Sequence, residues 1–327
     1  MQINTGENKL KKILKRFWDM QESSIILLTF AFFIVVQTVN SAFFNSSNIV
    51  NILRSTSYLL ITACGMTFVL ISGNIDLSVC TVMGLGGIIF CLFITSGLPI
   101  IAAFVLTFLI AATIGVINGF LIHKLKIPAM IMTLGMQYIA KGIINVLTKG
   151  SPVYPLPEAF TKLDSLTIFG MPLIAVIALV VAAVSWVTIK KTRLGREIYA
   201  VGGNPESARL SGINNRKIFI IVYVISAALS MFSGIAMAAR VGSAQASSGA
   251  GYELNSIVAA LIGGTSITGG AGGIAGTVLG ALFVMALQNG LLMLHVDVYF
   301  QQLFIGIIVV LAVIWDQYRR SLQLKKM

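Results

Sequence analysis

Charged side chains are scarce in this chain of 327 residues, of which only 10% are Asp, Glu, Lys or Arg. Hydrophobic residues make up 57% of the chain. A soluble domain of this length could not hide that much apolar surface, so lipid must solvate much of it. The composition therefore excludes a soluble domain with a single anchor. It predicts an all-α polytopic membrane protein with one transmembrane domain over residues 1–327.

Cysteine and histidine are also rare, with three and two residues respectively. Cys64, Cys80 and Cys91 lie in apolar segments without metal-ligand spacing, so we interpret them as small packing residues. His123 and His295 are expected at opposite faces of the membrane, where they cannot share a metal. Because acids, histidines and cysteines do not cluster at one face, the sequence predicts no catalytic residues, no metal site and no cofactor in this chain. An integral-membrane enzyme is disfavoured for the same reason.

The dipeptide Gly-Lys never occurs, which excludes ATP binding by a P-loop. The glycines from Gly270 to Gly273 only loosely match a dinucleotide-binding motif, and close helix packing explains them better. No apolar stretch carries a central carboxylate, which is the usual machinery of a proton-coupled or sodium-coupled carrier. A self-sufficient secondary carrier remains the alternative function, but the sequence offers it no good ion site.

About ten apolar stretches are candidates to cross the bilayer, since one span needs roughly 20 apolar residues. The candidates are Ser24–Phe44, Ser55–Ser72, Leu77–Thr95, Pro99–Ile122, Pro128–Thr148, Leu166–Ile189, Ile218–Ala239, Leu254–Thr268, Gly276–Leu294 and Phe300–Trp315. The glycine-rich stretch Leu254–Thr268 is the least regular. We expect it to be either a full span or a broken, re-entrant one.

The distribution of basic residues orients the ten spans. With the N-terminus inside, eighteen of the 23 Lys and Arg residues fall on the inner side, as the positive-inside rule requires. The net charge of +12 is therefore assigned to membrane orientation and not to nucleic acid. This topology predicts three cytoplasmic segments, namely the tail 1–23, the loop 190–217 and the tail 316–327.

Ten spans also suggest two halves of five, which would be inverted relative to each other in the membrane. A weak sequence similarity between two segments of the chain favours this arrangement. The segment Gly73–Gly87 reads GNIDLSVCTVMGLGG, and Gly251–Gly264 reads GYELNSIVAALIGG. Chance similarity is the alternative explanation.

The polar insert Lys190–Lys217 contains the signals of a short helix. Asn204 suits the N-cap, Pro205 the first helical position and Gly212 the left-handed position after the helix. Glu206 suits the positive end of the helix and Arg209 the negative end. The small Ala208 and the apolar Leu210 complete a surface for another protein. We therefore expect a transport subunit that is driven from outside itself.

Polar side chains within apolar stretches are expensive in lipid and usually face a cavity or another helix. We predict that such residues line a translocation path for a hydrophilic solute, with inter-helix hydrogen bonding as the equal alternative. The path candidates are Asn118, Gln137, Asn145, Gln288 and Asn289.

Three further polar residues, Asn74, Asp76 and Glu253, are candidates for a helix start or a gate. Asp76 could ligate a cation together with Asn74 and Ser78. A carboxylate favoured by the dipole at the first turn of a helix is the preferred interpretation.

Four segments together resemble the ribose/xylose-type permeases of bacterial ABC sugar importers. They read GMTFVLISGNIDLSVCTVMGLGG, TLGMQYIAKGI, TRLGREIYAVGGNPESARLSGI and GYELNSIVAALIGGTSITGGAGGIAGTVLGAL. The resemblance covers about Ser47 to Asp316. Asn74 and Cys80 depart from it, because the family commonly has glycine at both positions, and this puts the exact substrate in doubt.

The resemblance implies a permease subunit in the bacterial inner membrane that imports ribose or a similar pentose by alternating access. Gly203–Gly212 would be the helix that couples it to an ATPase. The implied partners are a second permease subunit, in a homodimer or a heterodimer, a separate ATPase that carries ATP and Mg²⁺, and a periplasmic or lipid-anchored sugar-binding protein. Permeases for branched-chain amino acids are the alternative on substrate.

Overall fold

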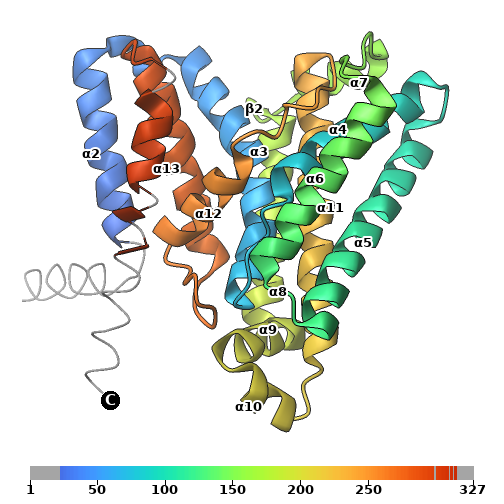
Figure 1. Cartoon of the computed structure of the whole chain (residues 1–327). Coiled ribbons are helices and arrows are strands. Elements are labelled where there is room, and N and C mark those ends of the chain that lie inside the picture. Colours follow the sequence, from blue (N-terminus) through green and yellow to red (C-terminus); the bar gives the residue numbers. More distant parts are fainter. Residues whose placement is uncertain (1–22, 298–299, 309, 312, 315–327) are drawn as a thin grey trace, which may run out of the picture.

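The computed structural model describes residues 23–297, 300–308, 310–311 and 313–314, and these residues are mostly helical (Figure 1). The first half contains α2 (Ser23–Val39), the 3-10 turn η1 (Ser41–Phe44), α3 (Ser46–Ile71), α4 (Val79–Thr95), α5 (Ile100–Leu125), α6 (Ala129–Thr148) and α7 (Glu158–Ser165). After a hairpin of β1 (Thr167–Ile168) and β2 (Met171–Pro172) come α8 (Leu173–Lys191), α9 (Arg193–Gly203), α10 (Pro205–Leu210), α11 (Asn215–Val241), α12 (Tyr252–Ile262) and α13 (Ile274–Met293).

Six of the described helices are long and apolar enough to cross a membrane, namely α3, α5, α6, α8, α11 and α13. The helices α2, α4 and α12 are apolar but shorter. The predicted last span, Phe300–Trp315, is helical at 300–308, 310–311 and 313–314. The predicted tail 316–327 and nearly all of the tail 1–23 lie outside the described residues.

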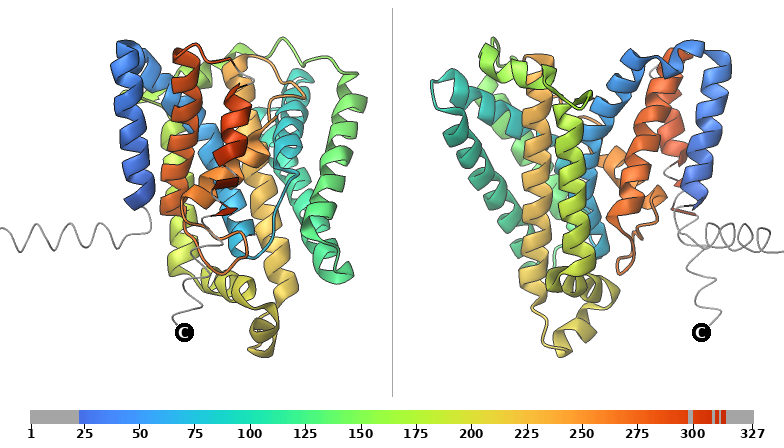
Figure 2. Two further views of the ribbon diagram at one scale, coloured as in Figure 1. Left: turned by 60° about the vertical axis from the view of Figure 1, so that its left-hand side comes forward. Right: turned by 180° about the vertical axis from the view of Figure 1, so that it is seen from behind.

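The bundle is built around α3 and α11. Helix α11 packs against α3, α4 and α5, while α13 packs against α3 and α12. Figure 2 shows α2 and α13 together on one side of the molecule and α4, α5 and α6 on the other. Helices α5, α6 and α8 expose most of their surface, whereas α3 is mostly buried.

Glycine lets α5 and α11 approach closely. A Cβ added at Gly115 would lie 2.4 Å from the Cα of Val224, and one added at Gly119 would lie 2.6 Å from the Cα of Ile220. Backbones in a membrane bundle approach this closely where small residues line the contact. The pair therefore forms a tight seam along the outer side of α11.

One predicted span needs correction, and a second, for which two outcomes were expected, is shorter than a full span. Leu166–Ile189 is not one helix, because its first residues form a hairpin that turns at Phe169 and Gly170, both of which have positive φ. The two-residue loop with positive φ at both positions matches the twist of paired strands. Leu254–Thr268 is not one full span, because α12 has 11 residues and ends at Ile262. At 1.5 Å per residue it covers about half of a bilayer.

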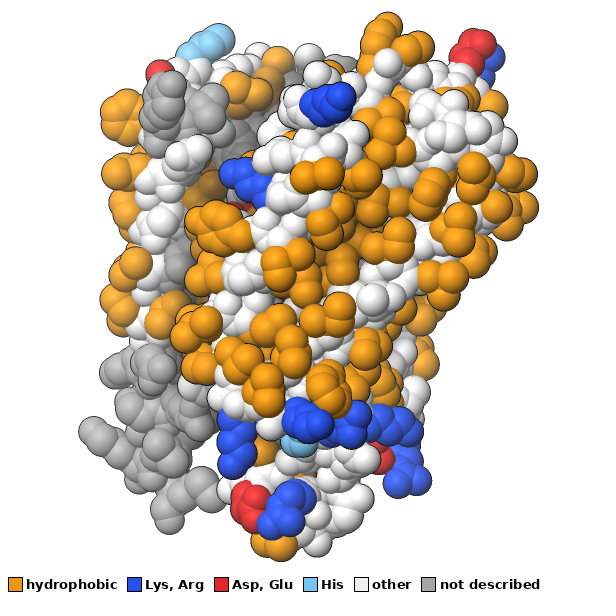
Figure 3. Space-filling view, turned by 45° about the vertical axis from the view of Figure 1, so that its right-hand side comes forward, with side chains coloured by type: hydrophobic (Ala, Val, Ile, Leu, Met, Phe, Trp, Pro, Cys, Tyr) orange, Lys and Arg blue, Asp and Glu red, His pale blue; other side chains and the backbone are white. Residues whose placement is uncertain are grey.

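Basic side chains gather at one end of the bundle. The ends of α5 and α8 and the start of α11 meet there, with Lys124 and Arg216 both lying over the ring of Phe120. Figure 3 shows Lys and Arg side chains gathered at this end, below a broad apolar surface. We call this the α10 end, and the opposite one, which carries α7, the α7 end.

Candidate functional site

The helix predicted in the polar insert is α10, and both of its ends are capped. The Asn204 side chain accepts a hydrogen bond from the backbone N–H of Ser207 at 3.0 Å, and Pro205 occupies the first helical position. This is the arrangement that an N-cap residue provides for a donor in the first turn. Helix α9, which precedes α10 in the same insert, was not predicted from the sequence.

The C-terminal end of α10 closes on Gly212, whose φ is +83°. The N–H of Gly212 donates to the carbonyl of Arg209, and the N–H of Ile213 donates to the carbonyl of Ala208, both at 3.0 Å. These two bonds form a Schellman motif, which needs a left-handed residue at this position. The Asn215 side chain also donates to the Pro205 carbonyl at 2.8 Å, which ties α10 to the start of α11.

The outer face of α10 carries one apolar residue and one ion pair. Leu210 is 75% exposed. Glu206 and Arg209 form an exposed ion pair, and the bonds to Arg209 hold the pKa of Glu206 below its ordinary value. The expectation that Ala208 contributes to this outer surface is wrong. Ala208 is buried in the same apolar cluster as Ile198, because the helix turns this face onto the rest of the chain.

Behind α10, helix α9, the end of α3 and the loop that joins α12 to α13 meet in a junction at several glycine residues. The Ile71 carbonyl at the end of α3 accepts a hydrogen bond from the N–H of Gly270 at 2.9 Å. A Cβ added at Gly202 in α9 would lie only 1.8 Å from that carbonyl oxygen. The Tyr199 hydroxyl donates to the Gly272 carbonyl at 2.7 Å. The α9–α10 unit therefore touches both the end of α3 and the loop that joins α12 to α13.

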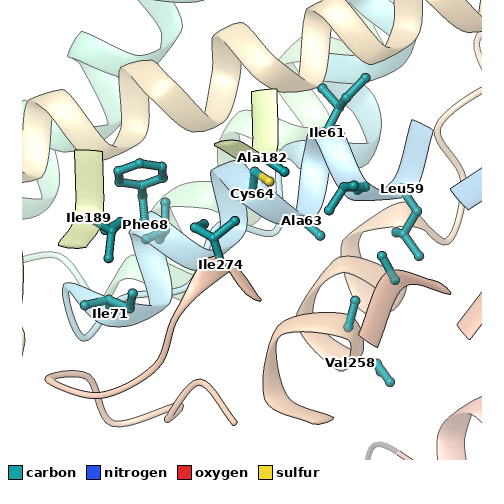
Figure 4. Packing of buried hydrophobic residues seen from close by; sticks show 14 of the residues in the cluster. Leu59, Ile61, Ala63, Cys64, Phe68, Ile71, Ala182, Ile189, Val258 and Ile274 are labelled. Atoms are coloured by element: carbon teal, nitrogen blue, oxygen red, sulfur yellow. The ribbon is translucent and has the colours of Figure 1, made fainter. Parts of the chain in front are cut away.

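Apolar packing continues the junction into the bundle. Figure 4 shows Phe68 and Ile71 of α3 near Ile189 of α8 and Ile274 of α13, and all four belong to one buried cluster that also contains Ile198 of α9. Helix α9 packs directly against α3, α8 and α11, so a displacement of α9 would press on three long helices at once.

Asp76 lies just before α4 and is buried. Its carboxylate accepts hydrogen bonds from the backbone N–H and the hydroxyl of Ser78, and from the hydroxyl of Ser226 on α11 at 2.8 Å. The link to α11 was not predicted. The Asn74 side chain turns away and donates to the Ser72 carbonyl and hydroxyl. The three residues suggested for a cation site are therefore not arranged around one point.

The five path candidates do not form one lining. Asn118 is buried in α5, between the two glycines that contact α11, and its amide oxygen has no hydrogen-bond partner among the described residues. The Gln288 side chain donates to Asn255 on α12 at 3.3 Å. Asn118 and Gln288 therefore lie at contacts between helices of this chain.

Asn289 forms a reciprocal amide pair with Asn48 of α3. Each side chain donates to the amide oxygen of the other, at 2.9 and 3.0 Å. The Asn48 amide also donates to the Phe43 carbonyl at 2.8 Å. The geometry corresponds to inter-helix hydrogen bonding and joins α13 to α3.

Because of this pair, we expect Asn289→Ala to lower the yield of folded protein and not the transport rate per folded molecule. Inter-helix hydrogen bonds in membranes contribute about 0.6 kcal/mol on average. Thermal unfolding of Asn289→Ala, Asn48→Ala and the double variant should therefore give a favourable coupling energy of that order. Additive effects of the two single variants would contradict a direct bond.

Gln137 and Asn145 lie elsewhere, on the outer part of α6. They are spaced at i and i+8 with Lys141 between them, so the three share one face. Lys141 and Asn145 are exposed, Gln137 is half-buried, and none of the three makes a side-chain hydrogen bond to the residues that the structure describes. A stripe of this kind is costly against lipid.

Sequence analysis also missed a charged cluster at the α7 end. Arg54 of α3 forms an ion pair with Asp164 of α7, and the Tyr58 hydroxyl donates to the same carboxylate at 3.1 Å. Arg240 of α11 lies 5.7 Å from the centre of the Tyr58 ring. Nothing in the sequence paired Arg54 or Arg240 with residues so far along the chain.

Glu253 lies in the first turn of α12, as its position in the sequence suggested. One of its carboxylate oxygens is buried without a hydrogen-bond partner among the described residues. Cys80, which departs from the family motif, lies beside it at the start of α4. The starts of α4 and α12 therefore meet inside the bundle.

Comparisons with known proteins agree with this architecture. A family model described as "Branched-chain amino acid transport system / permease component" matches residues 48–313. The ribose import permease of Haemophilus influenzae is 38% identical over 93% of this chain and 94% of its own length. The ribose import permease of Escherichia coli K12 is 37% identical over 95% and 98%. The D-allose transport system permease of the same strain is 33% identical over 92% of each chain. No solved structure matches. The chain therefore belongs to the family of membrane permeases that this model describes.

Proposed function

We propose that this chain is the membrane-spanning subunit of an ATP-driven ABC importer for a monosaccharide, namely ribose or a similar pentose. The relatives named above import ribose and D-allose, which favours a sugar over a branched-chain amino acid. The observation that carries the proposal is α10, a helix capped at both ends that presents the exposed Leu210 at the basic end of an apolar bundle. Such a helix fits a groove on an ATPase subunit.

The α10 end would face the cytoplasm of a bacterial cell, with the chain in the inner membrane and both termini inside. The basic residues gathered at this end support the orientation. Ten spans in two inverted halves would include α2, α4, α12 and the last helix beside the six long ones. The short helices α4 and α12 both begin inside the bundle, after Ser78 and Gly251 respectively, and the meeting of their starts supports equivalent places in the two halves.

The proposed transport cycle uses the junction behind α10. Closure of the ATPase would move α10, and α9 would pass the movement to α3, α8 and α11 through Gly202 and the apolar cluster around Ile198. Helices moving against each other as rigid bodies would then open the path to one side and afterwards to the other. This chain contributes the path, while ATP and Mg²⁺ belong to the separate ATPase.

Reconstitution tests this proposal directly. The purified chain alone should neither bind nor hydrolyse ATP, because it has no P-loop. In lipid nanodiscs with its ATPase and a sugar-loaded binding protein, it should support ATP hydrolysis that the loaded protein stimulates. Sugar uptake by the chain alone, driven by an ion gradient, would instead establish the secondary carrier.

We further propose that the polar stripe of α6 faces the path, which would run between this chain and a second copy. Gln137, Lys141 and Asn145 would then contact water and solute instead of lipid. Gln137→Ala and Asn145→Ala should lower sugar uptake while membrane levels and assembly stay normal. Tyr138→Ala on the adjacent, more exposed face of α6 is the matched control. Normal uptake with both amide variants would remove the stripe from the path.

A further inference from the structure

A cavity of about 170 Å³ lies among the membrane helices at the α7 end. Its lining comes from five helices, α4, α5, α7, α8 and α11. The lining side chains include Phe104, Phe160, Leu173, Ile177, Phe232 and Ala236. None of the residues discussed for coupling or for the path lines it, so the cavity is a separate feature of the fold.

The cavity reaches the surface of the bundle. Ile100 of α5 and Leu163 of α7 both line it and are each 40% exposed, whereas Phe90 of α4 and Ile235 of α11 line it and are buried. Phe90 and Ile235 therefore lie at its floor, and its mouth opens at the start of α5 and at α7. The outward surfaces of α5 and α8 are apolar, with Ile101 80% exposed and Leu179 50% exposed.

The side chains that line the cavity determine which kind of molecule could bind there. Asp164 is the one polar residue among the described residues that line the cavity, and its carboxylate is already engaged by Arg54 and Tyr58. A sugar would leave its hydroxyl groups without partners there. Water needs two to four polar partners, and apolar cavities of about 150 Å³ stay dry and accept apolar guests. Lipid acyl chains solvate the apolar surface around the cavity, and they are apolar guests of this kind.

We propose that an acyl chain of a membrane phospholipid enters beside the start of α5 and fills this cavity. The chain would pack against Phe160 and so hold α7 onto the bundle beside the ion pair of Asp164 with Arg54. An unfilled cavity would forfeit the dispersion contacts of every side chain in its wall. The occupant would come from the leaflet on the α7 side, since the mouth lies at that end.

The test uses the full chain, assembled with its partners in nanodiscs that contain a phospholipid with a photoactivatable diazirine in one acyl chain. Adducts should concentrate in residues 160–177 and 232–239. Ala236→Phe, which fills the cavity from α11, should abolish these adducts. Ala183→Phe, on an exposed position of α8 away from the cavity, should leave them unchanged.

A second measurement separates lipid binding from mere proximity. Delipidation should lower the melting temperature of the wild-type chain more than that of Ala236→Phe, whose added ring replaces the guest. If the phenylalanine prevents folding, Ala236→Leu makes the same comparison with a smaller side chain. Adducts spread evenly along the apolar surface, or adducts that persist in a folded Ala236 variant, would overturn the proposal. Labelling by a free photoactivatable fatty acid but not by the phospholipid would overturn the assigned source.

Discussion

Gly202→Val is expected to destabilise the folded chain by about 3 kcal/mol or more, which is the upper range for forcing extra volume into a packed site. A Cβ at this position would lie 1.8 Å from the Ile71 carbonyl oxygen and 2.8 Å from the Gly270 nitrogen. Both of these atoms belong to the backbone, so the movement of a side chain cannot relieve the two close contacts. Helix α9 would have to separate from α3, and the hydrogen bond from Gly270 to Ile71 would break with it.

The neighbouring residue supplies the control. A Cβ at Gly203 would meet no atom of the described structure within 4 Å. Gly203→Ala should therefore change stability by about 0.5 kcal/mol or less, since only the local helix preference changes. Thermal unfolding in detergent and the yield of membrane-inserted protein measure both variants. Equal behaviour of the two variants would show that the crossing at Gly202 is not tightly packed.

The second large effect concerns the outer face of α10. Leu210→Asp should remove the stimulation of ATP hydrolysis by the loaded binding protein and reduce sugar uptake to background. Leu210 is 75% exposed, so its loss removes no core contact and the chain should insert and fold normally. Arg209→Glu should act in the same direction, because it places a like charge beside Glu206 and reverses the charge at the proposed docking face.

Lys217→Glu is the matched control for the α10 variants. It reverses an exposed charge at the same end of the molecule but lies on α11, beyond the capped helix. We expect it to retain coupling. Similar losses from Lys217→Glu and Arg209→Glu would show that general charge at this end matters and that α10 has no special role.

The sequence predicted α10 well because short-range signals determine it. Asn204, Pro205 and Gly212 act within one or two turns of the helix, and their roles follow from residue type alone. Buried Ala208 could not be predicted in the same way. Which face of a six-residue helix turns inward depends on Ile198 in α9, a helix that the sequence did not reveal.

The polar residues within the helices show the same limit. Hydropathy placed Asn289 in an apolar stretch, but its partner Asn48 lies 241 residues away in the chain. Asp76 was expected in the first turn of a helix, but it lies before α4, whose first turn has no acidic residue, and its bond to Ser226 depends on the packing of α11. The span Leu254–Thr268 was marked as irregular because of its glycines, yet its half-length helix became clear only with the fold.

If α10 is the contact through which a separate ATPase drives this permease, site-specific photocrosslinking from position 210 should capture that ATPase. The experiment places a photoreactive residue at position 210, instead of Leu210, in the complete importer. We expect a single adduct with the ATPase subunit, which changes in yield when nucleotide is added, and no such adduct from position 217. Absence of any ATPase adduct from position 210 in a complex that still hydrolyses ATP and imports sugar would contradict this role of α10.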